Sequence, residues 1–490
     1  MTAKWKRAIV GGGLSLALLA PCFWQPRIEA GDLSSHVYNA WLAQLIERGQ
    51  APGLALVRQT NNVLFDLMLS GLMRGVGITA AQRISVSVAV LIFFWGAFAF
   101  VRSSARPRRA PWQLVPCLAM LTYGWVFRMG LFNFYMALGL AFGALAAARR
   151  NRRWAWALAA VLAVAGYVAH PLPVIWASGM LVYERVAQAL RPRQRSGLMI
   201  AMLVVLALAG IAVGIFFETR RGIDQLAATT GAEQVWVYGK PYVAMSVALL
   251  AVWVLCFFRV ARRRGAGRLV LDVRFQLWAL TGAALVLLPA GVLLPGYRSG
   301  LDFVAERMSL AGAVLLCGML ASWRLPEPLV GATVVLAVAF FARSYVDERQ
   351  FNGLETRMER VVAQLPPGQR VVSALADPGI RIPVEVHMID RVCVGRCFSY
   401  ANYEPCTWQF RVRAKGPNSI VVSNYGDSWD LQNGQYRVKR QDLPMYKVGR
   451  CGTAGGGLCV AALEPGDTLQ GSGRRPVNQG ERSLSASSRR

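Results

Sequence analysis

The sequence predicts a mainly α-helical, polytopic transmembrane bundle joined to a smaller external domain. Apolar residue types make up 55% of the 490 residues, whereas charged types make up 16%. Apolar stretches, many of them 16–22 residues long, recur between residues 8 and 345. That is the length an α-helix needs to cross a hydrocarbon core. A polar composition follows only after residue 345. These observations exclude a soluble single-core protein and a disordered chain.

The charge balance is strongly basic. The chain carries 54 Lys and Arg against 26 Asp and Glu, a net charge of +28. Such a charge can indicate a nucleic-acid partner. Here the basic runs lie between apolar segments, as they do in the cytoplasmic loops of membrane proteins. We therefore expect a lipid bilayer, and no nucleic acid, as a partner of this chain.

The first apolar segment, residues 8–24, follows Lys4, Lys6 and Arg7, and no small-residue cleavage site comes after it. This pattern predicts a retained signal anchor with a cytoplasmic N-terminus. Further spans are expected at residues 84–101, 112–127, 130–148, 154–170, 172–188, 198–217, 241–258, 274–294, 308–323 and 328–345. About eleven spans that begin inside place the C-terminal part outside.

The distribution of basic residues agrees with this topology. The loops predicted inside hold 22 Lys and Arg in 53 residues, whereas those predicted outside hold 11 in 105. The density is thus about fourfold higher inside, as the positive-inside rule requires. We expect a multi-pass protein of the bacterial cytoplasmic (inner) membrane. Its N-terminus is cytoplasmic and its C-terminal domain is periplasmic or extracellular.

The first external loop, residues 25–83, is long enough to hold structure of its own. The segment Leu33–Arg48 carries apolar residues along one side of a helix, and Asn62–Met73 carries a polar stripe at i+4 spacing. Asn62–Met73 is too short to span a membrane. Both segments predict amphipathic helices that lie at the membrane surface.

The segment after residue 345 predicts a separate α+β domain. Asp347–Leu365 has the pattern of a polar helix that ends at Pro366. Short β-like runs follow at residues 370–375, 384–389, 409–412, 420–423, 435–439 and 458–463. We therefore divide the chain into a membrane domain (1–345), an external domain (346–470) and a disordered basic tail (471–490).

The cysteines separate into two groups. Cys393, Cys397, Cys406, Cys451 and Cys459 all lie in the external domain. In an oxidising compartment they are disulfide candidates. We favour Cys451 with Cys459, and Cys406 with Cys393 or Cys397. A zinc site formed by His387 and the Cys393-x3-Cys397 pair is the alternative.

Acidic residues of the membrane domain gather on the predicted outer side, so we look for a site there. Asp32, His36 and Asn39 follow at i, i+4 and i+7, on one face of a helix. A carboxylate and an imidazole on that face can act as a general base and its helper. The alternative is that Asp32 only caps the helix beginning at Leu33. The two roles are compatible.

A resemblance to a known family adds to this interpretation. A single N-terminal span, an acidic residue early in a long external loop, two surface helices and a many-span bundle resemble the GT-C superfamily of integral-membrane glycosyltransferases. The run Phe127–Phe134 is also similar. The resemblance covers residues 5–345. It implies transfer of a sugar from a polyprenyl-phosphate carrier to a glycan, lipid or protein acceptor, with Asp32 activating the acceptor.

The resemblance also requires groups that bind substrate. We expect this role for Asn39, Asp66, Arg128, His170, Arg298 and Arg307, because arginine suits phosphate oxygens. For His170 we favour the alternative of a helix-terminating turn. Arg298, Asp302 and Glu306 recur at i+4, and for the two acids we favour an ion-pair ladder. No metal-ligand motif is evident, and the resemblance leaves Mg²⁺ or Mn²⁺ open as a cofactor.

Two other classes of function compete with a glycosyltransferase. A polytopic transporter or flippase usually has polar residues or broken helices near the middle of the membrane. The predicted spans are mostly Ala, Leu, Val and Gly, which favours the enzyme. A non-catalytic scaffold for assembly of cell-envelope polysaccharide would not need Asp32.

Overall fold

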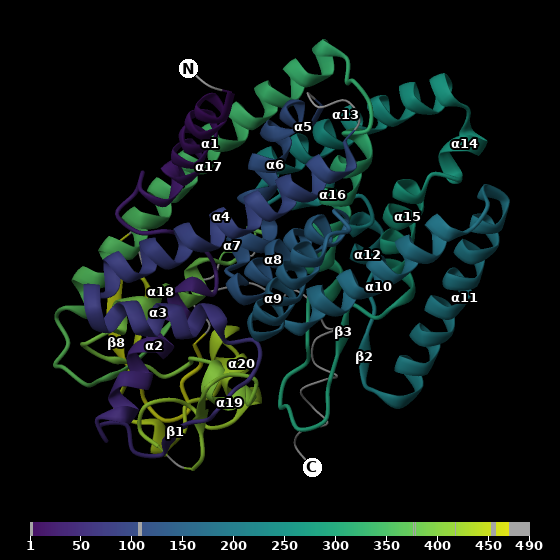
Figure 1. The fold of residues 1–490 in the computed structure, drawn as a ribbon. Helices are drawn as coiled ribbons and strands as arrows, with labels where there is room; N and C mark the ends of the chain where they lie inside the picture. The colour runs from purple at the N-terminus through teal and green to yellow at the C-terminus, as the bar shows by residue number, and fades with distance from the viewer. Residues whose placement is uncertain are drawn as a thin grey trace. The chain divides into compact units, whose positions relative to one another are not determined.

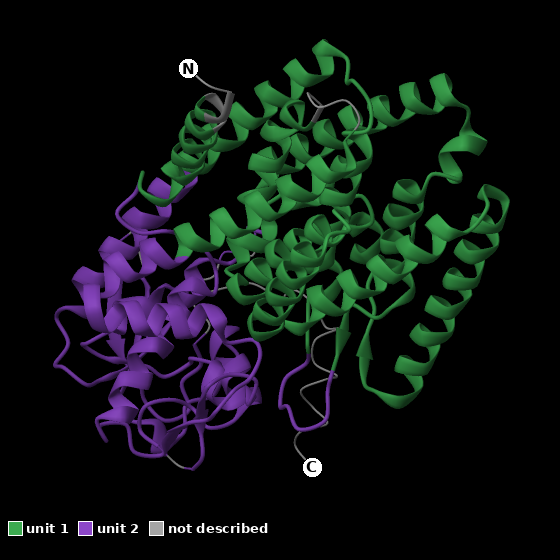
Figure 2. Ribbon diagram, in the orientation of Figure 1, with its two compact units in different colours: residues 1–24, 86–292, 301–345 green, residues 25–85, 293–300, 346–490 purple. Residues whose placement is uncertain are grey.

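The computed structural model describes residues 3–105, 110–375, 377, 379–416, 418–451 and 457–469, and it shows a mainly helical chain (Figure 1). The predicted disordered tail, residues 471–490, lies outside the described residues. The chain divides into two compact units (Figure 2). Unit 1 comprises residues 1–24, 86–292 and 301–345, and unit 2 comprises residues 25–85, 293–300 and 346–490.

This division differs from the predicted boundary at residue 345. The first external loop and the short segment 293–300 cluster with the C-terminal domain and not with the helical bundle. The boundaries also fall inside helices. One lies within α4 (Ile78–Ser104), and another lies within α17 (Glu327–Val362), which continues directly into the polar helix expected from Asp347.

Unit 1 is built from helices of apolar composition. Besides its parts of α4 and α17, it contains α1 (Ala3–Leu19), η1 (Ala20–Cys22), α5 (Ala110–Gln113), α6 (Val115–Thr122), α7 (Trp125–Met129), α8 (Phe132–Ala148), α9 (Arg153–Ala169), α10 (Pro171–Ala189), α11 (Pro192–Phe216), α12 (Asp224–Ala228), η2 (Ala232–Val235), α13 (Lys240–Arg264), α14 (Ala266–Val270), α15 (Val273–Leu287) and α16 (Val304–Leu320). The two-residue strands β2 (Thr219–Arg220) and β3 (Gly291–Val292) pair antiparallel.

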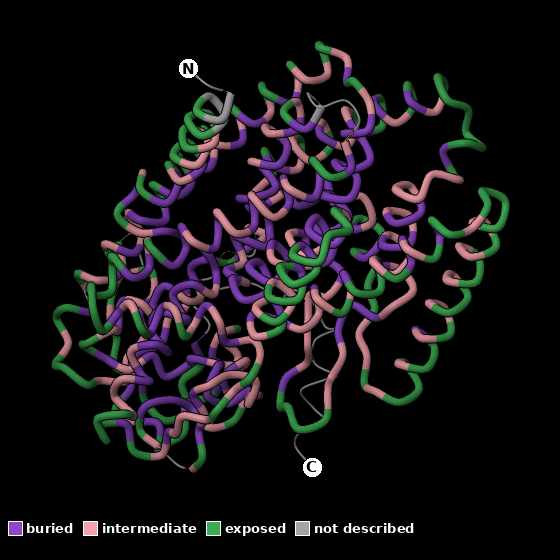
Figure 3. Tube along the Cα trace, viewed as in Figure 1, coloured by how far each residue is buried: buried purple, intermediate pink, exposed green. Residues whose placement is uncertain are grey.

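Four helices of the described part are long and apolar enough to cross a membrane, namely α4, α11, α13 and α17. Shorter apolar helices include α8, α9 and α15. The chain is therefore compatible with a membrane protein, and the number eleven stays a prediction. On α11 the apolar window is only 6% buried inside the protein (Figure 3), as expected for a helix whose side chains face lipid.

The predicted span at 112–127 is not one helix. Pro111 and Pro116 lie in the first turns of α5 and α6, and Gly124 forms the N-cap of α7. Proline lacks the N–H that would continue a preceding helix. A Cβ at Gly124 would lie 2.8 Å from the carbonyl oxygen of Gln234, so only glycine fits this break without displacement.

Unit 2 combines short helices with two small sheets. Its helices are α2 (Leu33–Glu47), α3 (Leu64–Val76), α18 (Glu385–Cys393), α19 (Glu404–Thr407), α20 (Tyr425–Gln432) and η3 (Arg440–Asp442). Its strands are β1 (Leu54–Leu56), β4 (Arg370–Ser373), β5 (Phe398–Ser399), β6 (Val412–Ala414), β7 (Met445–Arg450) and β8 (Leu458–Ala462). Strand β1 of the first loop pairs antiparallel with β6, which ties the two distant segments together.

The main sheet has the strand order β5-β4-β7-β8. Strand β4 is parallel to both of its neighbours, and β7 pairs antiparallel with β8. A core that includes Val372, Leu431 and Met445 packs beside this sheet. The sequence predicted β4, β8 and part of β6 but missed β7, and residues 420–423 and 435–439 are not regular strands.

The run 384–389 was predicted as a strand but lies mostly in helix α18. Its alternation of apolar and polar residues is too short to distinguish the two periods. The helix buries Met388, Ile389 and Val392, which recur at helical spacing. This correction matters because α18 carries residues of the candidate site.

Both helices predicted in the first loop are present, but α2 is not an amphipathic surface helix. Ten of its fifteen residues are buried, including Leu33, Ser35 and Asn39 from different sides. It packs against α18 and α3 as a core helix of unit 2. Helix α3 keeps the expected amphipathic character, with Phe65 and Leu69 buried and Leu67 exposed.

The disulfides of the C-terminal domain confirm one predicted pair and correct the other. Cys451 and Cys459 are bonded, as favoured, whereas Cys393 is bonded to Cys397 and not to Cys406. The four-residue separation at the end of α18 brings the two sulfurs together without help from another element. Cys406 is a buried thiol whose Sγ lies 3.1 Å from the carbonyl oxygen of Tyr403.

Candidate functional site

Two elements of the first loop bring four predicted residues into one region of unit 2. Asp32 precedes α2, His36 and Asn39 lie on α2, and Asp66 lies on α3. The imidazole Nδ1 of His36 lies 2.7 Å from Oδ1 of Asp66. The side chain of Asp32 makes no capping hydrogen bond to α2. The alternative that Asp32 serves only as a side-chain N-cap is therefore not supported.

The C-terminal domain adds a second carboxylate near the same nitrogen of His36. Oε1 of Glu404 accepts a hydrogen bond of 3.1 Å from the hydroxyl of Ser35 and lies 3.9 Å from Nδ1 of His36. Burial lowers the pKa of His36, but the charge and hydrogen bond of Asp66, together with Glu404 and Asp32, outweigh it and raise the pKa to about 10. Burial raises the pKa of Glu404 to about 8, against the opposing charge of His36.

A second imidazole lies beside Asp32. Nε2 of His387 lies 3.6 Å from Oδ1 of Asp32, and its Nδ1 lies 3.1 Å from Oδ2 of Asp390. Burial lowers the pKa of His387, but the hydrogen bond and charge of Asp390, with Asp32 and Glu404, raise it overall. The hydroxyl of Ser399 donates a hydrogen bond to Asp390, which fixes that carboxylate.

These groups form two lines of contact, here called the acid–histidine cluster: Asp66–His36–Glu404 and Asp32–His387–Asp390. Asp32 and Asp390 lie at opposite nitrogens of His387, whereas Asp66 and Glu404 both lie at Nδ1 of His36, at 2.7 and 3.9 Å. In each line the outer carboxylate is partly exposed, at 16% and 18% of its side chain, whereas the inner one is buried. Asn402 connects the lines: it donates to Asp390 and to the hydroxyl of Ser35, which in turn donates to Glu404.

The arrangement is suited to proton transfer. A histidine in contact with a carboxylate holds its proton more tightly, and its positive charge stabilises the negative charge of the outer carboxylate. That outer carboxylate is the member of each line that an incoming hydroxyl can reach. Among the described residues no group of three or more His, Cys, Asp or Glu side chains is placed to hold a metal ion. The zinc alternative fails for a second reason, since Cys393 and Cys397 are bonded to one another.

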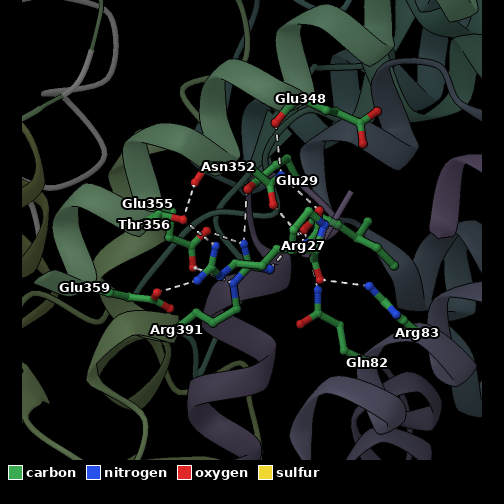
Figure 4. Close-up of polar contacts among 12 residues, drawn as sticks. Arg27, Glu29, Gln82, Arg83, Glu348, Asn352, Glu355, Thr356, Glu359 and Arg391 are labelled. Carbon is green, nitrogen blue, oxygen red and sulfur yellow. Dashed lines mark hydrogen bonds and ion pairs between the residues drawn. The ribbon is translucent and has the colours of Figure 1, made fainter. Parts of the chain in front are cut away.

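A buried ion-pair network holds the chain that leads into α2 (Figure 4). Arg391 of α18 donates to both oxygens of Glu355, at 2.8 and 2.5 Å, and to Glu29 at 3.1 Å. Arg27 donates to Glu359 and bonds reciprocally with Asn352 through its backbone. Burial and the charge of Glu355 raise the pKa of Glu29, whereas Arg391 opposes the rise. The network fixes α18, and with it His387 and Asp390.

Arg298 also belongs to unit 2, but the predicted ladder of Arg298, Asp302 and Glu306 does not form. Arg298 and Asp302 precede α16, so only Glu306 lies on that helix. Asp302 instead pairs with Arg220 at 3.8 Å. The guanidinium of Arg298 lies over the ring of Trp408, 4.1 Å from its centroid.

The remaining predicted ligands belong to unit 1. His170 is the N-cap of α10, where its Nδ1 accepts a 3.2 Å hydrogen bond from the N–H of Leu172. This agrees with the favoured structural role, although the bond is to an amide and not to a carbonyl. Arg128 on α7 is 1% exposed and lies near the rings of Tyr123 and Phe127. Arg307 lies in the first turn of α16.

Sequence reasoning missed three members of the cluster, namely His387, Asp390 and Glu404. The sequence pattern around His387 indicates only a zinc ligand. The helical spacing of His387 and Asp390, at i and i+3, was a usable signal once α18 was recognised as a helix. Nothing local marks Glu404 as their neighbour. No family model, curated protein or solved structure matches this chain.

Proposed function

We propose that this protein is an integral-membrane glycosyltransferase that moves a sugar from a polyprenyl-phosphate carrier to an acceptor at the outer face of the membrane. The observation that carries the proposal is the position of Asp32, a partly exposed carboxylate backed by the His387–Asp390 pair. The resemblance of residues 5–345 to the GT-C superfamily supplies the reaction class.

In the proposed reaction Asp32 accepts the proton of an acceptor hydroxyl as its oxygen attacks the anomeric carbon. The bond from that carbon to the phosphate oxygen breaks, and the lipid phosphate leaves with the bonding electrons. His387 stabilises Asp32 in its charged form before the attack, and Asp390 orients the imidazole. His36 and Asp66 form the neighbouring line, which we assign to binding the acceptor.

The composition of unit 2 supports the predicted pattern of membrane crossings. Its three segments form one compact unit, so they lie on the same side of the membrane. The chain must then cross an even number of times between residues 85 and 293 and again between residues 300 and 346. The eleven-span prediction places eight spans in the first interval and two in the second, which satisfies both conditions.

One observation favours a transporter or flippase as the second candidate. The predicted span 112–127 is interrupted between α6 and α7, and the buried Arg128 lies directly after the break. Broken helices and buried charges are typical of transport sites. The enzyme remains the preferred function because each line of the acid–histidine cluster ends in a partly exposed carboxylate that can accept a proton from a hydroxyl.

The test uses the full-length protein in membrane vesicles with a panel of polyprenyl-phosphate sugars, with transfer of labelled sugar to endogenous acceptors as the readout. We expect Asp32→Asn to reduce transfer by at least about a hundredfold at normal protein level, the usual contribution of a general base. The matched control is Asp427→Asn, a surface carboxylate of unit 2 paired with Lys439. Unimpaired transfer by Asp32→Asn would refute the assignment, and scrambling of labelled lipid without transfer would favour the flippase.

A further inference from the structure

The side chain of Arg298 stacks on the ring of Trp408, the residue that follows α19. The guanidinium of Arg298 lies 4.1 Å from the centre of the Trp408 ring, and the Arg298 N–H donates to the carbonyl oxygen of Thr407 at 3.0 Å. Such a stack holds a long, otherwise mobile side chain in one orientation. The edge of the guanidinium, which carries its donors, stays accessible because Arg298 is exposed.

The surrounding backbone is fixed on both sides of the stack. Gln409 donates from Nε2 to the carbonyl oxygens of Ser299 and Gly300 and to the Ser299 hydroxyl, at 2.7–3.2 Å. Trp408 has a φ of +64°, a left-handed conformation that is strained for a bulky side chain. Strain of this kind persists where surrounding contacts enforce it, and it is concentrated at functional sites.

A comparison within the chain shows what is particular about Arg298. In unit 1, Phe303 also has a positive φ, of +59°, and carries the guanidinium of Arg220 at 5.6 Å. Arg220 has a carboxylate partner of its own, Asp302 at 3.8 Å. Among the described residues no carboxylate pairs with Arg298. The Arg298–Trp408 pair thus resembles the Arg220–Phe303 pair in placing a guanidinium over a ring with a positive φ, but it lacks a carboxylate like Asp302.

We propose that Arg298 and Trp408 form a subsite for an oxyanion, a carboxylate or phosphate group that presents two oxygens to the edge of the guanidinium. The planar fork of arginine donates two parallel hydrogen bonds to such a pair. The indole Nε1–H of Trp408 is buried and has no acceptor among the described residues.

The subsite belongs to unit 2, as the acid–histidine cluster does. Trp408 follows Glu404 by four residues, at the end of the short helix α19. We infer that the oxyanion is the anionic part of the molecule on which the cluster acts. This last step rests on the proposed function, whereas the binding itself does not.

Binding is measured with the full-length protein in nanodiscs of zwitterionic lipid, by calorimetric titration and without transfer. Inorganic phosphate and glucuronate represent soluble phosphate and carboxylate, and phosphatidic acid in the nanodisc represents a lipid phosphate. We expect at least one probe to bind the wild type and Arg298→Gln to weaken that binding about tenfold. The responsive probe identifies the source of the oxyanion.

Two variants control this measurement. Arg48→Gln removes the same charge from an exposed arginine elsewhere in unit 2 and is expected to bind as the wild type. Arg298→Lys keeps the charge but lacks the planar fork, so we expect it to lose most of the affinity. The proposal is overturned if no probe binds, or if Arg298→Gln binds like Arg48→Gln. Those results would leave the test of Asp32 unaffected.

Discussion

At the scale of single residues, the acid–histidine cluster makes stability depend on pH. The pKa of His36 rises from its ordinary 6.5 to about 10, and that of Glu404 rises from 4.5 to about 8. A raised folded-state pKa means that the folded chain binds the proton more tightly than the unfolded chain. The stabilisation is complete below the unfolded pKa and is lost as the pH rises through the folded one.

This gives a prediction for the interval from pH 6.5 to 8, in which both groups hold extra protons in the folded state. We expect the melting temperature of the purified protein to fall as the pH rises through this interval. Glu404→Gln removes one of the two titrations and should reduce the slope by up to about 1.4 kcal/mol per pH unit. Glu47→Gln, on the exposed end of α2, should retain the wild-type slope. An unchanged slope in Glu404→Gln would contradict the assignment.

The sequence could predict half of this cluster. Asp32, His36 and Asn39 follow one another at helical spacing, so their proximity is a local property that periodicity reveals. His387 and Glu404 reach the same place from more than 350 residues away along the chain. Their proximity depends on tertiary packing, which a single sequence does not encode in any local pattern. The lack of a capping bond from Asp32 is likewise visible only in the structure.

At the scale of elements, the length of an apolar segment predicted a helix more reliably than the alternation of apolar and polar residues predicted a strand. Most of the apolar segments predicted as spans coincide with helices, because helix formation in an apolar environment follows from backbone hydrogen bonding alone. The exceptions are the broken 112–127 region and 274–294, where α15 ends at Leu287 and strand β3 follows. The strands of unit 2 are two to six residues long, too short for a period of two to be distinguished from chance. This is why 384–389 was mistaken for a strand and β7 was missed.

The contact between α4 and α8 permits a sharp prediction at this scale. A Cβ at Gly96 would lie 2.0 Å from the carbonyl oxygen of Gly139, and a Cβ at Gly139 would lie 2.5 Å from the Cα of Phe93. The two backbones touch directly, so neither can yield as a flexible side chain would. We expect Gly96→Ala to destabilise the protein by about 1–3 kcal/mol through overpacking, seen as a lower melting temperature in detergent.

The control for this helix contact is Gly179→Ala on α10. A Cβ at Gly179 meets nothing within 4 Å, and replacing a helical glycine by alanine favours the helix by about 1 kcal/mol. The two substitutions are therefore expected to act in opposite directions. If Gly96→Ala also left the melting temperature unchanged or raised it, the close approach of α4 and α8 would be incorrect.

At the scale of the whole molecule, unit 2 is assembled from segments that the predicted membrane spans separate. Strand β1 must find β6, and α2 must find α18, across more than 340 residues. Contacts of such long sequence separation form late because their loop-closure entropy must be overcome first. Unit 2 can therefore be completed only after the last predicted span has been inserted. The C-terminal domain as predicted, beginning at residue 346, would lack α2, α3 and β1.

The same construction fixes which loops share a side of the membrane, and this gives the last prediction. Arg48, Tyr297 and Asn433 represent the three segments of unit 2, whereas Arg150 and Arg263 represent loops predicted on the opposite side. Single cysteines introduced at these positions are labelled with a membrane-impermeant maleimide. In right-side-out vesicles we expect the first three to react and the other two to be protected, with the reverse pattern in inverted vesicles. The buried native thiols give a constant background.

Labelling of Arg48→Cys and Asn433→Cys from opposite sides would contradict the compact unit itself. Joint labelling of all three from the inside would keep the unit, but it would place the acid–histidine cluster on the cytoplasmic face and remove the outer-face transferase.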